Sequence, residues 1–340
     1  MSADDSYASA AAGPSLEVAP ATDNDAQDWA RIVLDANDGT LHHELPFLAY
    51  HPPGRFNFFH TVVRRGSDIV ALVPGGLVHR NGGNIFVSPL GASVGGPLIL
   101  RPLLAETIAV VEALQTNALK RGWKGLEFVL GPTAYQRRPA DATAFALFAR
   151  GFQLIERELT FIVPLEPAAV DGYQTLFRKK QAWSVRAARR RGVVVSHGGS
   201  ELYAPFIELF RETYGRHGVA PTHTEAEIAD LLQRLPGRVE ITLASRGDIP
   251  LAAILVFRLN DRAAQTFYIC SSKAHARENG TVMALSALID RLAADGFRAL
   301  DLGPSASSQH VNAGVVFFKE GLGAVGQVRD RWAWATCTNE

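Results

Sequence analysis

The chain has 340 residues, of which 47% are hydrophobic and 20% are charged, a composition typical of a globular protein with about two domains or lobes. Its 34 basic and 34 acidic residues give a formal net charge of +0, which argues against a general attraction to nucleic acid or membranes and leaves only local charged patches. The two cysteines, Cys270 and Cys337, lie far apart and predict neither a disulfide framework nor a zinc site.

The first 14 residues are rich in Ala, Ser and Asp and predict a disordered tail. No basic segment followed by an apolar one stands near this end, so a secretory signal is not expected. No stretch approaches the roughly 20 apolar residues of a membrane span. Together with the sparse cysteines, these features predict a cytoplasmic protein.

Residues 15–168 are expected to form a first lobe. Its predicted elements are a strand at 15–21, a helix at 23–37, several strands with glycine turns over 55–90, an amphipathic helix at 103–122, a strand at 126–132, a helix at 141–150 and two strands within 151–165. Residues 169–340 are expected to form a second lobe with helices at 172–192, 200–218, 222–235, 280–297 and 314–323, and strands at 193–197, across 238–272 as an antiparallel set of three, at 298–304 and at 326–336.

The two lobes share a sequence pattern near their ends. Residues 118–132 read ALKRGWKGLEFVLGP and residues 291–305 read RLAADGFRALDLGPS, and both predict a helix, a glycine, a strand and then Gly-Pro. Such a recurrence suggests a structural duplication. The predicted class is α+β, with two similar lobes, each a mixed, mostly antiparallel sheet flanked by helices.

Four stretches carry a family resemblance: SPLGASVGGPLI at 88–99, WSVRAARRRGVVV at 183–195, the run from Gly280 through FRALDLGPS, and GVVFFKEGLGA at 314–324. Their order and spacing resemble the FemAB-like branch of the GNAT acyltransferases, which includes the CelD-type domain. The resemblance covers roughly residues 15–335. It implies a tandem GNAT fold and an N-acyltransferase in which the acceptor attacks the acyl donor directly.

The resemblance leaves two acyl donors open. Many GNAT enzymes hold the pyrophosphate of acyl-CoA with an Arg/Gln-x-x-Gly-x-Gly/Ala loop at a helix start. The corresponding KAHARENGTVMA offers only Arg277, Asn279 and Gly280. The neutral net charge favours acyl-CoA as co-substrate over aminoacyl-tRNA, the donor of Fem-type relatives. No permanently bound cofactor and no metal is expected.

Residues 178–192 contain seven cations and no acid. On a helix, Lys179, Trp183, Arg186 and Arg190 share one face. We expect Arg186 and Arg190 to bind phosphates of CoA, of a nucleotide-linked acceptor or of a tRNA. The competing interpretation is a solvated helix face.

The resemblance assigns a catalytic part to Lys319, whose ammonium would stabilise the oxyanion formed during acyl transfer. Tyr268 and Ser271 lie on the strand expected to hold the donor, and Asp301 or His223 would handle the proton. Each has a structural alternative: a helix-end lysine, strand packing, a strand-end hydrogen bond or a helix-entry histidine.

The expected acceptor is an amine, or less often a hydroxyl, of a small molecule, an amino sugar or a cell-envelope precursor. The oligomeric state is left open. A non-catalytic ligand-binding protein on a GNAT scaffold is the alternative from a different class, because the pyrophosphate loop is incomplete.

Overall fold

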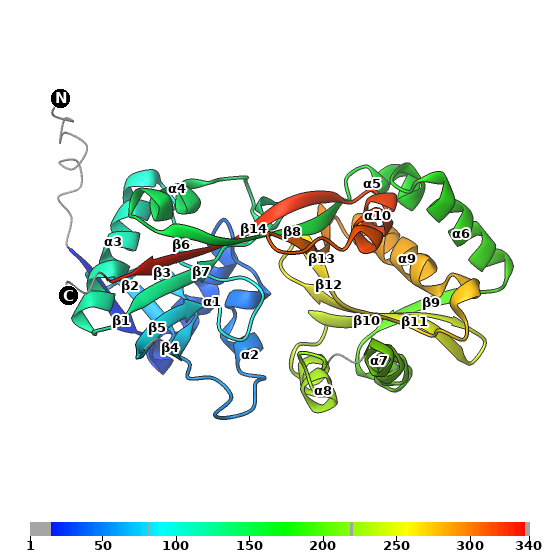
Figure 1. Cartoon of the computed structure of the whole chain (residues 1–340), viewed down its shortest axis with the longest axis horizontal. Coiled ribbons are helices and arrows are strands. Elements are labelled where there is room, and N and C mark those ends of the chain that lie inside the picture. Colours follow the sequence, from blue (N-terminus) through cyan, green and yellow to red (C-terminus); the bar gives the residue numbers. More distant parts are fainter. Residues whose placement is uncertain (1–14, 81, 218–219, 337–340) are drawn as a thin grey trace.

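The computed structural model describes residues 15–80, 82–217 and 220–336, which form two lobes lying side by side and joined by two long strands (Figure 1). The tail predicted for residues 1–14 lies outside this range. Among the described residues, none of the helices combines the length and the apolar character that a membrane-spanning segment requires.

Lobe 1 contains most of the elements before residue 150. In chain order they are β1 (Leu16–Pro20), α1 (Ala26–Asp35), α2 (Leu45–Leu48), β2 (Thr61–Arg65), β3 (Asp68–Val73), β4 (Gly76–Arg80), β5 (Gly83–Ser88), β6 (Leu98–Ile99), α3 (Leu104–Lys120), β7 (Gly125–Val129) and α4 (Ala142–Ala149), with short 3-10 turns at Asp23–Asp25, Leu41–His43 and Thr133–Tyr135.

Lobe 2 follows the connecting strand β8 (Gln153–Pro164). Its elements are α5 (Ala168–Asp171), α6 (Lys179–Arg190), β9 (Val194–Gly198), α7 (Tyr203–His217), α8 (Glu225–Arg234), β10 (Val239–Arg246), β11 (Ile249–Arg258), β12 (Ala263–Ser271), α9 (Gly280–Ala294), β13 (Ala299–Ser307) and α10 (Ala313–Gly321), with 3-10 turns at Gly172–Thr175, Ser200–Leu202 and Ala276–Glu278. The second connecting strand, β14 (Val325–Ala335), comes last.

One ten-stranded sheet runs through both lobes in the order β4-β5-β7-β14-β8-β13-β12-β11-β10-β9, and a separate sheet in lobe 1 has the order β1-β2-β3-β6. Among the strands that the structure describes, only the β5/β7 and β12/β13 neighbours are parallel, and the other pairs are antiparallel. The predicted α+β class with mixed, mostly antiparallel sheets is therefore confirmed.

The two lobes exchange strands at their junction. β8 leaves lobe 1 and pairs with β13 of lobe 2, while β14 leaves lobe 2 and pairs with β7 of lobe 1 (Figure 1). Between these ends β8 and β14 pair with each other. The boundary at residue 168 stays a prediction, and the pairing adds that each lobe's sheet is completed by a strand from the other half of the chain.

The prediction of two strands within residues 151–165 was wrong, because β8 is a single strand of 12 residues. The segment QLIERELTFIVP contains no glycine or Asx turn residue at which the chain could reverse. Its change from exposed to buried residues reflects passage from the inter-lobe ribbon into lobe 2 rather than a turn.

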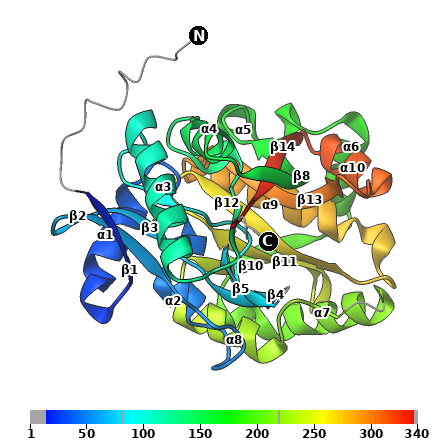
Figure 2. The same cartoon turned by 60° about the vertical axis from the view of Figure 1, so that its left-hand side comes forward.

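Helices cover both faces of the sheet in lobe 2, with α6 and α9 on one side and α7 and α8 on the other (Figures 1 and 2). The core beneath α7 and α8 also contains Leu41, Phe47 and Tyr135 of lobe 1. The lobes therefore share one apolar core at their junction, which fixes their relative position.

The repeated helix-glycine-strand pattern forms the same structure twice. After α3, Gly122 has φ +66° and Trp123 N–H bonds to Ala118 O, and after α9, Gly296 has φ +83° and Phe297 N–H bonds to Leu292 O. These are Schellman-type helix ends, which favour glycine because it adopts positive φ without strain. Each glycine turns the chain into the strand of a parallel pair.

Residues 1–168 produced alone would lack β14 and leave the buried strand β7 with an unpaired edge. We expect this fragment to aggregate and to show no cooperative transition in thermal circular dichroism. Fusing residues 325–336 to it through a short flexible linker should restore a cooperative transition, because Val325 lies opposite Ile162. Cooperative unfolding of the unfused fragment would contradict this prediction.

Candidate active site

The parallel strands β12 and β13 pair over only three residues each, Ala263–Gln265 with Ala299–Asp301, and then diverge. Beyond this point the backbone groups of each strand that face the other have lost their ladder partners. A cleft of about 740 Å³ opens between the diverging strands.

Irregularities in both strands produce the divergence. In β12, Tyr268 and Thr266 lie opposite the consecutive residues Leu255 and Val256 of β11, so Phe267 is an extra, bulged residue. In β13, the pairing with β8 shifts between Asp301 and Pro304, where Gly303 has φ +80°. The bulges turn the two strands away from each other.

The cleft, called the β12–β13 cleft below, lies at the junction of the lobes. It combines apolar side chains with hydroxyl groups and two cations. Its lining comprises Ser93, Tyr214, Thr222, Gln265, Thr266, Phe267, Tyr268, Ile269, Leu285, Leu302, Gly303, Pro304, Ser305, Asn312, Val315, Phe318, Lys319 and Arg329.

Lys319 lies in the wall of this cleft with only 6% of its surface exposed. Its ammonium donates a hydrogen bond to Gly303 O at 2.7 Å and lies 5.7 Å from the centre of the Phe161 ring. Burial lowers the pKa of Lys319 to about 8, and the nearby Asp301 carboxylate opposes this shift. Helix α10 therefore holds a desolvated cation at the cleft, not a solvent-exposed helix-end lysine.

Asp301 lies behind the cleft rather than in it. One carboxylate oxygen accepts hydrogen bonds from Gly303 N–H at 2.7 Å and from the Thr160 hydroxyl, and the other accepts one from the Tyr135 hydroxyl. The side chain is 2% exposed and does not line the cleft. The same carboxylate therefore fixes the bulge whose carbonyl holds Lys319.

Tyr268 lines the cleft and connects it to His223. The Tyr268 hydroxyl is 2.8 Å from His223 Nδ1 and accepts a hydrogen bond from His223 N–H at 3.0 Å, while His223 Nε2 contacts the Tyr50 hydroxyl of lobe 1. Burial lowers the pKa of His223 to about 4 and raises that of Tyr268. The imidazole is thus neutral near pH 7, and its Nδ1 connects to the cleft through Tyr268.

The other predicted phosphate ligands gather at the N-terminus of α9. Asn279 has φ +61°, and a Cβ on Gly280 would lie 2.7 Å from Leu251 Cβ, so Gly280 permits close packing of α9 on β11. Leu285 of the cleft lies five residues further along α9, about 7.5 Å at the helical rise. Free N–H groups of the first helical turn are suited to bind an anion.

The C-terminal end of α6 lies beside this helix start, because Arg191 Nη1 donates to Arg277 O at 2.7 Å. Arg186 and Arg190 are exposed on α6, and neither forms an ion pair with a carboxylate of the described residues. The structure thus brings Arg190 and Arg277 to one region and places Arg186 about one turn further along α6.

Ser271 does not line the cleft. Its backbone N–H donates to Thr213 Oγ1 at 3.1 Å, which ties the end of β12 to α7. Sequence reasoning missed Tyr50, Tyr135 and the Gly303 carbonyl. Tyr50 and Tyr135 lie in lobe 1, and nothing in their local sequence signals contact with lobe 2; only the repeated Leu-Gly-Pro marks Gly303 as a special position.

Comparison with known proteins supports this description of the fold. Residues 176–310 match the model of the acetyltransferase (GNAT) domain. No curated protein matches the chain in sequence.

Solved structures with the same arrangement cover nearly the whole chain. FemX has a TM-score of 0.73 at 13% identity, covering 94% of this chain and 97% of FemX. The C-terminal domain of a putative lysylphosphatidylglycerol synthetase from Agrobacterium fabrum has a TM-score of 0.60 at 11% identity, with 91% of each chain covered. A tandem GNAT protein from the clavulanic acid biosynthesis pathway has a TM-score of 0.53 at 14% identity, covering 96% of this chain and 100% of that one.

Residues 176–310 of lobe 2 therefore match a GNAT acetyltransferase domain, and the chain as a whole has a tandem GNAT fold. The class of enzyme that this domain and fold define is the GNAT-type N-acyltransferase.

The buried ammonium of Lys319 should lower the stability of the folded chain at neutral pH. Because the pKa of Lys319 falls from its ordinary 10.5 to about 8 on folding, the unfolded state binds more protons between these values. Stability therefore rises from pH 8 toward pH 10.5, and below pH 8 the penalty is about 3 kcal/mol at most. We expect Lys319→Met to unfold in urea with about 1–3 kcal/mol more free energy than the wild type at pH 7, and with a smaller difference at pH 10.

The matched control is Lys120→Met, which replaces an exposed lysine of α3. This variant should show no pH-dependent difference from the wild type. A loss of stability in Lys319→Met at pH 7, or an equal difference from the wild type at both pH values, would refute the buried-cation interpretation.

Proposed function

We propose that the chain transfers an acyl group from acyl-CoA to an amine of a small-molecule, amino-sugar or cell-envelope precursor acceptor. The observation that carries this proposal is the placement of Lys319 in the wall of the β12–β13 cleft, where the diverging strands expose backbone groups. A thioester carbonyl in this cleft would meet an ammonium and free N–H donors.

The reaction would be a direct displacement. The acceptor nitrogen attacks the thioester carbonyl carbon, the new C–N bond forms, and negative charge develops on the carbonyl oxygen beside Lys319. The C–S bond then breaks and the thiolate leaves with the proton that the nitrogen loses. Tyr268 lines the cleft, and we assign its hydroxyl, which stays protonated because burial raises its pKa, to relay that proton: it donates its own proton to the leaving thiolate and takes the nitrogen's proton in its place.

Two further residues act through others in this proposal. His223 contacts Tyr268 and Tyr50 and orients the Tyr268 hydroxyl. Asp301 holds Gly303 and favours the charged form of Lys319, so it is a positioning residue rather than a base. The donor phosphates would lie at the start of α9, near Asn279 and Arg277.

Aminoacyl-tRNA is a second candidate donor, favoured by one observation. The exposed cations Lys179, Lys180, Arg186, Arg189 and Arg190 of α6 form no ion pair with any acid in the part of the chain that the structure describes. Such a surface also suits a nucleic-acid backbone. The neutral overall charge is the reason to place acyl-CoA first.

Replacing Lys319 with methionine should lower kcat by about 100- to 1000-fold, because one preformed donor to the oxyanion is lost. The dissociation constant for the acyl donor, measured by calorimetry, should change little. Turnover is measured as thiol release from acetyl-CoA and longer acyl-CoAs with a panel of amines, with Lys120→Met as the control. If the wild type binds neither acyl-CoA nor charged tRNA saturably, the catalytic proposal is wrong. If turnover is unchanged in Lys319→Met, the lysine has no part in catalysis.

The double variant Arg186→Ala/Arg190→Ala should bind the acyl donor about tenfold or more weakly than the wild type, since each arginine offers a charge-assisted contact to phosphate. If the donor is a tRNA, the slope of log affinity against log salt should also fall by about 1.4 for two lost contacts. Arg101→Ala with Arg138→Ala, two exposed arginines of lobe 1, is the matched control. Equal affinities in both double variants would exclude the α6 surface as the phosphate site.

A further inference from the structure

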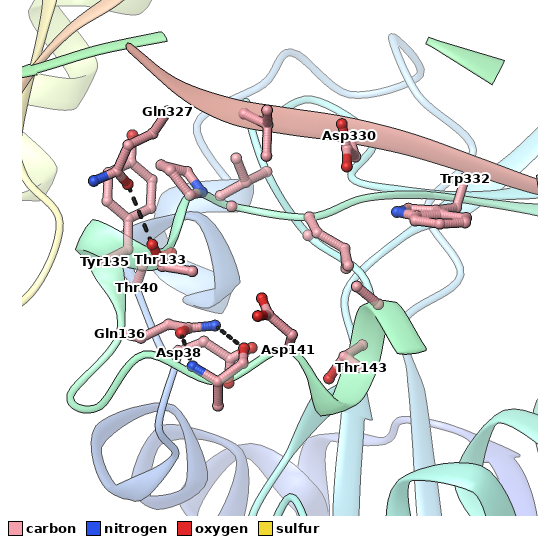
Figure 3. Close-up of a pocket in the computed structure, with 18 of the residues that line it drawn as sticks. Asp38, Thr40, Thr133, Tyr135, Gln136, Asp141, Thr143, Gln327, Asp330 and Trp332 are labelled. Carbon is pink, nitrogen blue, oxygen red and sulfur yellow. Dashed lines mark hydrogen bonds between the residues drawn. The ribbon is translucent and has the colours of Figure 1, made fainter. Parts of the chain in front are cut away.

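A second, smaller pocket of about 280 Å³ lies in lobe 1 and shares no residue with the β12–β13 cleft (Figure 3). It lies between β14, the segment that follows β7 and the segment that follows α1. Apolar and polar side chains both line it, and the polar ones include three carboxylates. The residues of this lobe-1 pocket are Asp38, Thr40, His43, Val94, Gly95, Leu130, Gly131, Pro132, Thr133, Tyr135, Gln136, Ala140, Asp141, Thr143, Ala144, Gln327, Val328, Asp330 and Trp332.

The lobe-1 pocket stands at the place in lobe 1 that corresponds to the β12–β13 cleft. Leu130-Gly131-Pro132 follows β7 as Leu302-Gly303-Pro304 ends β13. Aligning FARGF of α4 with FKEGL of α10 places Ala149 where α10 has Lys319. Lobe 1 therefore lacks the ammonium on which the proposed acyl transfer depends, and its pocket calls for a different use.

Trp332 provides an unpartnered hydrogen-bond donor in the lobe-1 pocket. Trp332 is only 8% exposed, and its indole Nε1 has no acceptor among the residues that the structure describes. Figure 3 shows the indole nitrogen facing the same open space as the Asp141 and Asp330 side chains. A buried N–H without a partner costs about 1–3 kcal/mol, so a ligand oxygen there would be favoured.

The carboxylates give the pocket its charge. Asp141 occupies the N-cap position of α4 but makes no capping hydrogen bond, and Figure 3 shows its carboxylate turned toward the pocket. Asp38 is desolvated, which raises its pKa to about 6, and it forms no ion pair with a described side chain. Asp330 alone has a cation partner, the bidentate Arg157 at 2.7 Å.

No lysine or arginine lines the lobe-1 pocket, so two carboxylates face it without a neutralising cation among its lining residues. An anionic ligand such as a phosphate would be repelled. A ligand with an ammonium group would pair with Asp38 and Asp141 and offset one of their two negative charges, and a hydroxyl or carbonyl oxygen on the same molecule would accept from Trp332. The volume suits a molecule about the size of one sugar ring.

We propose that the lobe-1 pocket is a second binding site, separate from the β12–β13 cleft, for a small molecule that carries an ammonium group beside hydroxyl or carbonyl oxygens, such as an amino sugar. Trp332 Nε1 donates to an oxygen of this ligand, and Asp141 and Asp38 accept from its ammonium. This inference does not depend on the proposed acyl transfer.

The test is nuclear magnetic resonance of the full chain with ¹⁵N-labelled tryptophan, which gives one indole N–H signal for each of the 5 tryptophans. Trp332→Phe assigns the signal of Trp332. Glucosamine is the probe, and glucose and N-acetylglucosamine, which lack the ammonium group, are the matched controls. We expect glucosamine to shift the Trp332 signal saturably and at least tenfold more tightly than either control sugar.

Asp141→Asn keeps the size of the side chain and removes its charge, and should weaken glucosamine binding about tenfold, whereas Lys319→Met should leave it unchanged. If Trp332→Phe does not fold, assignment proceeds through backbone resonances of β14 in the wild type. An unmoved Trp332 signal, an equal response to all three sugars, or equal binding by Asp141→Asn would overturn the proposal. Failure of acyl transfer alone would leave it intact.

Discussion

The carboxylate of Asp301 is the contact on which the geometry of the candidate active site depends. It accepts hydrogen bonds from Thr160 of β8, from Tyr135 of lobe 1 and from the backbone of Gly303. These bonds hold the end of β13 in its bulged form and away from β12. Without this bulge and the one at Phe267 of β12, two parallel strands would continue their ladder and no cleft would open.

The same contact sets the environment of Lys319. The Gly303 carbonyl that accepts from the lysine belongs to the residue whose N–H bonds to Asp301. The cleft thus contains a cation whose burial disfavours its charge and whose position is fixed by a carbonyl and a nearby carboxylate. Burial of the Lys319 ammonium lowers the stability of the folded chain. Such a destabilising, desolvated charge is typical of functional sites and atypical of surface lysines.

Local signals in the sequence predicted much of the fold. Glycine stops after α3, α6 and α9, the three antiparallel strands of lobe 2 and the repeated Leu-Gly-Pro ends are determined by nearby residues, and the structure has them where the patterns predict. The prediction of two strands was wrong for β8, a single strand whose burial changes along its length. That change arises from crossing between lobes, which no short window of sequence reveals.

The candidate site was predictable in part for the same reason. Lys319 belongs to a recognisable motif at a helix end, so its place at the cleft followed from the resemblance. The partners of Asp301 and His223 in lobe 1, Tyr135 and Tyr50, are 166 and 173 residues distant in sequence. Contacts over such separations depend on how the lobes pack, so the roles expected of Asp301 and His223 rested on residue type alone.

The strand exchange at the junction also bears on how the chain reaches its fold during synthesis. β7 of lobe 1 is buried and needs β14 as its neighbour, yet the ribosome makes β14 only after all of lobe 2. While lobe 2 is being synthesised, the sheet of lobe 1 has an unpaired edge at β7. Such an edge can bind chaperones or pair with strands of other chains. β14, which is made after the other strands of both lobes, thus ends this exposure, and translation pauses within lobe 2 would lengthen it.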